Sequence, residues 1–137
     1  MKRGKLLNSE VVSTLAKLGH TDQITISDAG LPIPDAVKRI DLAVVKNQPG
    51  FLLLLDAIMH EMIIEKVIIA EEIISQNQAI YSAIKDCFKE IEIVQVPHET
   101  FKSLTHKSKA VIRTGECTPF ANIILQSGVD FDGGSHE

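Results

Sequence analysis

The chain has 137 residues, a net charge of −4 and 45% hydrophobic residues, which is the composition of one ordinary globular domain. Its 14 lysines and arginines are scattered and outnumbered by 18 aspartates and glutamates, so the cationic surface that nucleic acids or anionic membranes require is not expected. The most apolar segment, residues 51–64, is interrupted by three polar side chains and is shorter than the roughly 20 apolar residues that cross a bilayer.

The first third of the chain predicts one helix and two strands. Apolar residues at helical spacing indicate a helix over residues 8–18, and His20 follows it on a loop. Residues 23–27 alternate in polarity and predict a strand. Glycine and two prolines then break the chain at 28–34, and a second strand is expected at 40–45.

The middle of the chain alternates between helical and strand patterns. Residues 51–65 predict a helix that is apolar over most of its circumference and therefore substantially buried. The β-branched run at 66–70 predicts an interior strand. A helix at 76–89 and a strand at 91–96 follow. Strands that alternate with helices in this way favour parallel pairing, because a helical crossover returns the chain to the same edge of the sheet.

The last third predicts a short helix at 98–107 and strands at 110–113 and 122–126. The expected fold is α/β: a single-domain, three-layer sandwich in which helices flank a largely parallel central sheet. No linker or internal repeat divides the chain, so residues 1–131 form the expected domain. Residues 132–137 are too polar to pack and are expected to form a flexible C-terminal tail.

Candidate chemistry lies on the loops that follow the strands, where open α/β sheets bind their ligands. Asp28 follows the first strand, His98 follows the strand that ends at residue 96, and residues 113–116 leave the next one. His20 lies on a separate loop. A histidine exchanges protons near neutral pH, and a carboxylate can orient its ring, so Asp28 could pair with either His20 or His98. Each histidine could equally be a solvated or capping residue.

Metal and cofactor motifs are absent from the sequence. It has no HExxH or HxH motif, no GxGxxG or P-loop motif and no GxSxG elbow. Cys87 and Cys117 do not form a CxxC pair and are expected to be free thiols in a reducing compartment. The N-terminus lacks the apolar core of a signal peptide. We therefore expect a cytoplasmic protein without metal or cofactor, whose catalysis, if any, is acid/base work by side chains.

Three motifs give the sequence a specific resemblance. They are LGHTD at residues 18–22, DAGLPIP at residues 28–34 and AVIRTGE at residues 110–116. Shorter matches, such as Ala121-Asn122, extend the similarity over residues 7–131. Together these segments resemble the ribose pyranase and fucose mutarotase family, and its ribose branch most closely.

The resemblance implies an isomerase that interconverts the pyranose and furanose forms of D-ribose or a related monosaccharide. Relatives of this kind assemble into closed rings, often stacked into homodecamers, with the sugar site at a subunit interface. His20 matches the family's acid/base histidine, and Asp28 and His98 match substrate-binding positions. So do Ala121 and Asn122, whereas Phe120 stands where the family usually has tyrosine. The Phe120 ring can still pack against the sugar, but it lacks the tyrosine hydroxyl.

Three other functions remain open on sequence alone. The missing hydroxyl at Phe120 favours a sugar-binding module, associated with ribose uptake, that does not turn its ligand over. A mutarotase that exchanges the anomers of fucose is a second alternative within the family. An α/β domain with an unrelated role is the third.

Overall fold

The structure is a computed structural model, and it describes residues 1–130. The expected tail at 132–137 lies outside the described residues. A single six-stranded sheet runs through the described part, in the order β2-β5-β1-β6-β3-β4. The strands are β1 (Gln23–Ser27), β2 (Lys38–Asp41), β3 (Ile64–Ala70), β4 (Glu92–Val96), β5 (Ala110–Arg113) and β6 (Ile123–Ser127).

The sheet is mixed, with one strand reversed. The pairs β1–β5, β2–β5 and β3–β4 are parallel, whereas β6 is antiparallel to both of its neighbours, β1 and β3. This confirms the expectation of a largely parallel sheet. Strand β6 is the exception because the loop that leads to it from β5 contains no crossover helix. The chain therefore enters β6 at the end of the sheet where β1 finishes, and β6 runs in the opposite direction.

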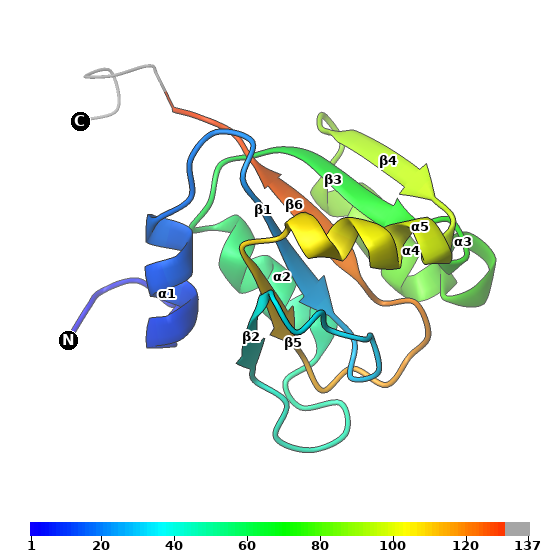
Figure 1. The fold of residues 1–137 in the computed structure, drawn as a ribbon, viewed down its shortest axis with the longest axis horizontal. Helices are drawn as coiled ribbons and strands as arrows, with labels where there is room; N and C mark the ends of the chain where they lie inside the picture. The colour runs from blue at the N-terminus through cyan, green and yellow to red at the C-terminus, as the bar shows by residue number, and fades with distance from the viewer. Residues whose placement is uncertain (131–137) are drawn as a thin grey trace.

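Helices cover both faces of the sheet and make three layers (Figure 1). They are α1 (Ser9–Ala16), α2 (Phe51–Met59), α3 (Ile73–Gln76), α4 (Gln78–Cys87) and α5 (His98–Leu104), the last followed by a 3₁₀ turn at Thr105–Lys107. Helix α5 lies on one face, where Phe101 packs against Ile68 and Ile124 of the sheet. The other four helices supply the larger core on the opposite face.

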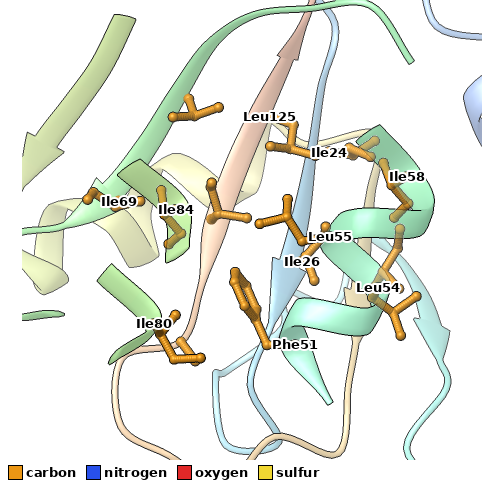
Figure 2. Close-up of a cluster of buried hydrophobic side chains, with 14 of the residues drawn as sticks. Ile24, Ile26, Phe51, Leu54, Leu55, Ile58, Ile69, Ile80, Ile84 and Leu125 are labelled. Carbon is orange, nitrogen blue, oxygen red and sulfur yellow. The ribbon is translucent and has the colours of Figure 1, made fainter. Parts of the chain in front are cut away.

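The larger core is aliphatic. Figure 2 shows Phe51, Leu55 and Ile58 of α2 pointing toward Ile24 and Ile26 of β1. Apart from the irregular start of β3, the strands send alternate residues to this core, so the side chains between them face α5 or the neighbouring loops. Because both faces are covered, β1 and β6 are buried over almost their whole length, as is the second half of β3.

The clearest differences from the sequence expectation lie in three regions. The helix expected at 51–65 ends at Met59, and β3 begins at Ile64, because Ile64 pairs with Ser127 of β6 and so joins the sheet. The helix expected at 76–89 corresponds to α4, which starts at Gln78 because the Asn77 side chain caps it there, and a short helix that was not expected, α3, precedes it. The strand expected at 40–45 is displaced to Lys38–Asp41, which leaves Val44 and Val45 exposed in a loop.

Candidate functional site

A pocket of about 490 Å³ opens where the parallel strands end. Its walls are the loop after β1 (28–32), the loop between β5 and β6 (116–120) and His98, the first residue of α5. Because β6 is antiparallel, its first residues lie at this same edge of the sheet. The pocket therefore occupies the position where open α/β sheets bind ligands.

Asp28 is held on the floor of this pocket by a network of hydrogen bonds. Its Oδ1 accepts from the backbone N–H groups of Gly30 (3.0 Å) and Leu31 (2.8 Å). Its own N–H donates to Asn122 Oδ1 (2.8 Å), and Asn122 Nδ2 donates weakly to Asp28 Oδ2 (3.3 Å). Burial raises the pKa of the Asp28 carboxyl above its usual 3.8, against the lowering effect of these donors. The carboxylate is rigid and has acceptor capacity left for a ligand hydroxyl.

His98 presents its ring between two phenylalanines. The ring stacks on Phe101, with centroids 6.4 Å apart, and meets Phe120 edge-on at 5.0 Å. Its backbone N–H donates to the Glu72 carboxylate (3.0 and 3.1 Å), which fixes the start of α5. Its Nδ1 is buried and, alone among the buried side-chain nitrogens and oxygens of residues 1–130, lacks a hydrogen-bond partner. The imidazole therefore stands in the pocket wall between two aromatic rings.

Phe120, Ala121 and Asn122 lie at different depths. Phe120 lines the pocket, and its φ is 58°. A bulky residue rarely adopts this left-handed conformation, so the surrounding loop must hold it there. Ala121 is fully buried and packs into the core beneath the loop. Asn122 is also fully buried, directly behind Asp28. Of these three predicted residues, Phe120 therefore reaches the pocket surface, and Asn122 acts on it through Asp28.

Glu116 ties the pocket loop to α2. Its Oε1 accepts from the first helical N–H, that of Phe51 (2.9 Å), and its Oε2 accepts from Thr118 Oγ1 (2.7 Å). Its backbone carbonyl accepts from Ala29 N (2.8 Å), in the opposite wall. A carboxylate at a helix N-terminus is favoured by the unpaired N–H groups there, so this one side chain anchors two pocket walls and a helix.

His20 lies at the other end of the sheet. Its loop precedes β1, whereas Asp28 follows β1, and five strand residues at about 3.3 Å each separate them by more than about 15 Å. Figure 1 shows β1 running from the α1–β1 loop at one end toward the β5–β6 loop at the other. The side chain of His20 is 55% exposed, and its Nε2 lies 2.7 Å from Glu65 Oε1. Within one chain, the possible pairing of His20 with Asp28 does not form.

Three carboxylates that the sequence did not identify as functional organise these two regions. Glu72 and Glu116 brace the pocket, and Glu65 holds His20. Glu65 and Glu116 lie in segments of family resemblance, but a solvated surface residue shows the same sequence pattern. Their partners are distant in sequence, so local spacing could not identify them.

Two kinds of feature are absent from the part of the chain that the structure describes. No group of three or more His, Cys, Asp or Glu side chains there could hold a metal ion. None of its helices has the length and hydropathy needed to span a membrane.

Comparisons with known proteins agree with this architecture over nearly the whole chain. The sequence matches the RbsD / FucU transport protein family over residues 1–130. It is 53% identical to a D-ribose pyranase of Geobacillus thermodenitrificans, covering 96% of this chain and 99% of that protein. It is 55% identical to a D-ribose pyranase of Bacillus cytotoxicus, covering 96% of this chain and all of that protein.

Solved structures give the same result. Bacillus subtilis RbsD, solved in complex with D-ribose, is 50% identical and superposes with a TM-score of 0.93, over 96% of this chain and all of that one. The fucose mutarotase of Streptococcus pneumoniae, solved with L-fucose, is 25% identical with a TM-score of 0.79, over 95% and 99% of the two chains. With its six-stranded mixed sheet, its pocket and a full-length match, this chain belongs to the RbsD / FucU transport protein family.

Proposed function

We propose that this protein is an isomerase of the D-ribose pyranase type, which interconverts the pyranose and furanose forms of D-ribose. The observation that carries the proposal is the identity of 53–55% to D-ribose pyranases over 96% of the chain. The pocket supports it independently, because a fixed carboxylate beside an aromatic ring suits a small polyhydroxylated ligand.

In this proposal the pocket holds the sugar by hydroxyl groups. Asp28 accepts hydrogen bonds from two hydroxyls, and Asn122 sets the direction of its carboxylate. His98 lines the pocket with its imidazole ring, and the Phe120 ring packs against the apolar face of the sugar. Ala121 contributes only its backbone, since its side chain is fully buried.

The reaction needs only the movement of protons. A pyranose opens when its anomeric hydroxyl loses a proton and its ring oxygen gains one. The open aldehyde then rotates, and another hydroxyl attacks the carbonyl carbon to close the furanose, with the proton transfers reversed. We assign the proton relay to His20, because imidazole both gives and takes protons near neutrality. General acid/base catalysis typically accelerates a reaction by about 10²- to 10⁴-fold, and these proton transfers require no cofactor.

His20 reaches the sugar from a neighbouring subunit in this proposal. One chain places His20 and the pocket at opposite ends of its sheet, so a head-to-tail ring would bring each His20 to the next pocket. Exposed apolar residues at both ends support such packing. Ile63 and Val129 lie at the Glu65 end, and Val44, Val45 and Leu53 lie near the pocket loops.

The assembly and its location are part of the same proposal. We infer a closed ring, as in the homodecamers that the family resemblance implies, acting in the cytoplasm. Cys87 and Cys117 are both exposed free thiols, which a reducing compartment would keep in that state.

Saturation-transfer NMR on D-ribose tests the proposal directly. Added wild-type protein should accelerate exchange between pyranose and furanose signals, and His20→Ala should abolish the acceleration while calorimetric ribose binding is retained. L-Fucose in the same assay separates a ribose pyranase from a fucose-type mutarotase. Ribose binding without any rate effect in the wild type would instead indicate a non-catalytic sugar-binding module.

A further inference from the structure

His20 is the end of a hydrogen-bonded chain of four side chains. Gln23 Nε2 donates to Gln126 Oε1 (2.9 Å), and Gln126 Nε2 donates to Glu65 Oε2 (2.9 Å). Glu65 Oε1 then lies 2.7 Å from His20 Nε2. The hydrogen bond from Gln126, and after it the contact with His20, hold the pKa of the Glu65 carboxyl below its usual range. Both carboxylate oxygens are therefore engaged, and the group is ionised at neutral pH.

The sheet itself aims Glu65 at His20. Strands β3 and β6 pair Ile64 with Ser127 and Lys66 with Gln126, so Glu65 is an extra residue in the ladder. Ile64 and Val67 are three positions apart, yet both pack into the same core, which a regular strand would not allow. This bulge turns the Glu65 side chain toward the His20 loop, and bulges commonly re-aim side chains next to active sites.

The His20 loop is fixed as firmly as Glu65. Gly19 N donates to Asp22 Oδ2 (2.8 Å), and Thr21 N donates to Ser127 O (2.9 Å). Thr21 has a φ of 70°, in the left-handed region that a β-branched residue rarely adopts. An exposed ion pair between two freely moving side chains contributes little to stability, partly because both side chains must be ordered. Here the loop of His20 and the strand of Glu65 are already held in place by backbone contacts.

We propose that Glu65 is the positioning residue for His20 and that it selects His20 Nδ1 as the atom that exchanges protons with the sugar. A carboxylate only accepts hydrogen bonds, so the neutral imidazole must carry its proton on Nε2. Nδ1 then holds the free lone pair, and no partner for it occurs among residues 1–130. When Nδ1 takes a proton, the ring becomes a cation that the adjacent carboxylate stabilises. This inference rests on the role proposed above for His20.

Kinetics of Glu65 variants give the first test. Glu65→Ala should lower kcat for D-ribose exchange by about 10- to 100-fold, the effect of losing a hydrogen bond to a charged group. KM should stay within about twofold of the wild-type value, because the substitution leaves the pocket around Asp28 unchanged. Glu65→Gln, whose amide oxygen can still accept from Nε2, should retain an intermediate kcat. Glu92→Ala, which removes an exposed carboxylate from edge strand β4, is the matched control and should behave as wild type.

NMR of ¹⁵N-histidine-labelled protein gives a readout that does not depend on turnover. The His20 signals, identified by their loss in His20→Ala, should show the Nε2–H tautomer in the wild type and a mixture of tautomers in Glu65→Ala. An Nδ1–H tautomer in the wild type, or a wild-type kcat in Glu65→Ala, would overturn the inference. Full activity in His20→Ala would instead refute the role of His20, so failure of the two proposals can be distinguished.

Discussion

At the scale of single residues, Phe120 is the position where the proposed sugar pocket lacks a hydrogen-bonding group. Its ring lines the pocket and meets His98 edge-on, so a para hydroxyl would extend from a ring that is already positioned. We predict that Phe120→Tyr tightens D-ribose binding about two- to twelvefold, the effect of one added neutral hydrogen bond of about 0.5–1.5 kcal/mol. Isothermal titration calorimetry measures this change, and thermal unfolding checks that the fold is kept. An unchanged Kd would show that the hydroxyl finds no partner on the sugar.

Candidate site residues could be predicted from the sequence by their own chemistry or by the family resemblance. Asp28, His98 and Phe120 were predicted as site residues, and the structure brings all three to one pocket. Glu65 and Glu116 were not singled out, because a glutamate beside a strand resembles any solvated charge. Their importance comes from partners more than 40 positions away, and only the folded chain shows those contacts.

At the scale of elements, the loop after β5 is packed directly onto the loop before α2. A Cβ atom added at Gly115 would lie 2.5 Å from Val45 O and 2.8 Å from Gln48 N, both of them backbone atoms that cannot turn aside. Gly115 also donates to Pro49 O (2.8 Å) and accepts from Asn47 N (2.6 Å). This close backbone contact sets the position of the pocket wall that continues to Phe120.

Gly115→Ala should therefore lower the free energy of unfolding by about 1–3 kcal/mol, the usual cost of overpacking, and weaken ribose binding as the wall shifts. Gly19→Ala is the matched control, since its nearest contact, Asp22 Oδ2 at 3.6 Å, is an ordinary van der Waals distance. Urea unfolding of both variants measures the difference. Equal stability of the two variants would contradict the packing argument.

Element types were predicted well, and element ends less well. Strands β1 and β5 match the expected ranges 23–27 and 110–113 because turn residues or polarity changes bound them on both sides. The boundary between α2 and β3 was misplaced because residues 62–64 are apolar and suit a helix or a strand equally. Pairing with β6, which lies about 60 positions later in the chain, determines where the strand begins. The spacing of apolar residues contains no information about that pairing.

At the scale of the whole molecule, strand direction separates the candidate acid/base group from the candidate sugar pocket. Every parallel strand ends at the pocket edge, whereas the loop that carries His20 enters β1 at the opposite edge. No rotamer change spans that separation within one chain. A head-to-tail interface resolves it, because such an interface joins unlike ends of two subunits and closes into a ring.

Mixing two inactive variants tests whether the site is shared. His20→Ala keeps its pocket intact, and Asp28→Ala keeps its His20, so each alone should be inactive. In a ring of randomly mixed subunits, about a quarter of the interfaces would pair an intact pocket with an intact His20. Co-expressed rings should therefore recover about a quarter of the wild-type rate of ribose exchange by saturation-transfer NMR. Rings of the double variant His20→Ala/Asp28→Ala mixed with wild type are the control, because there too a quarter of the interfaces remain intact. If the co-expressed single variants stay as inactive as each alone, His20 and Asp28 do not meet across an interface.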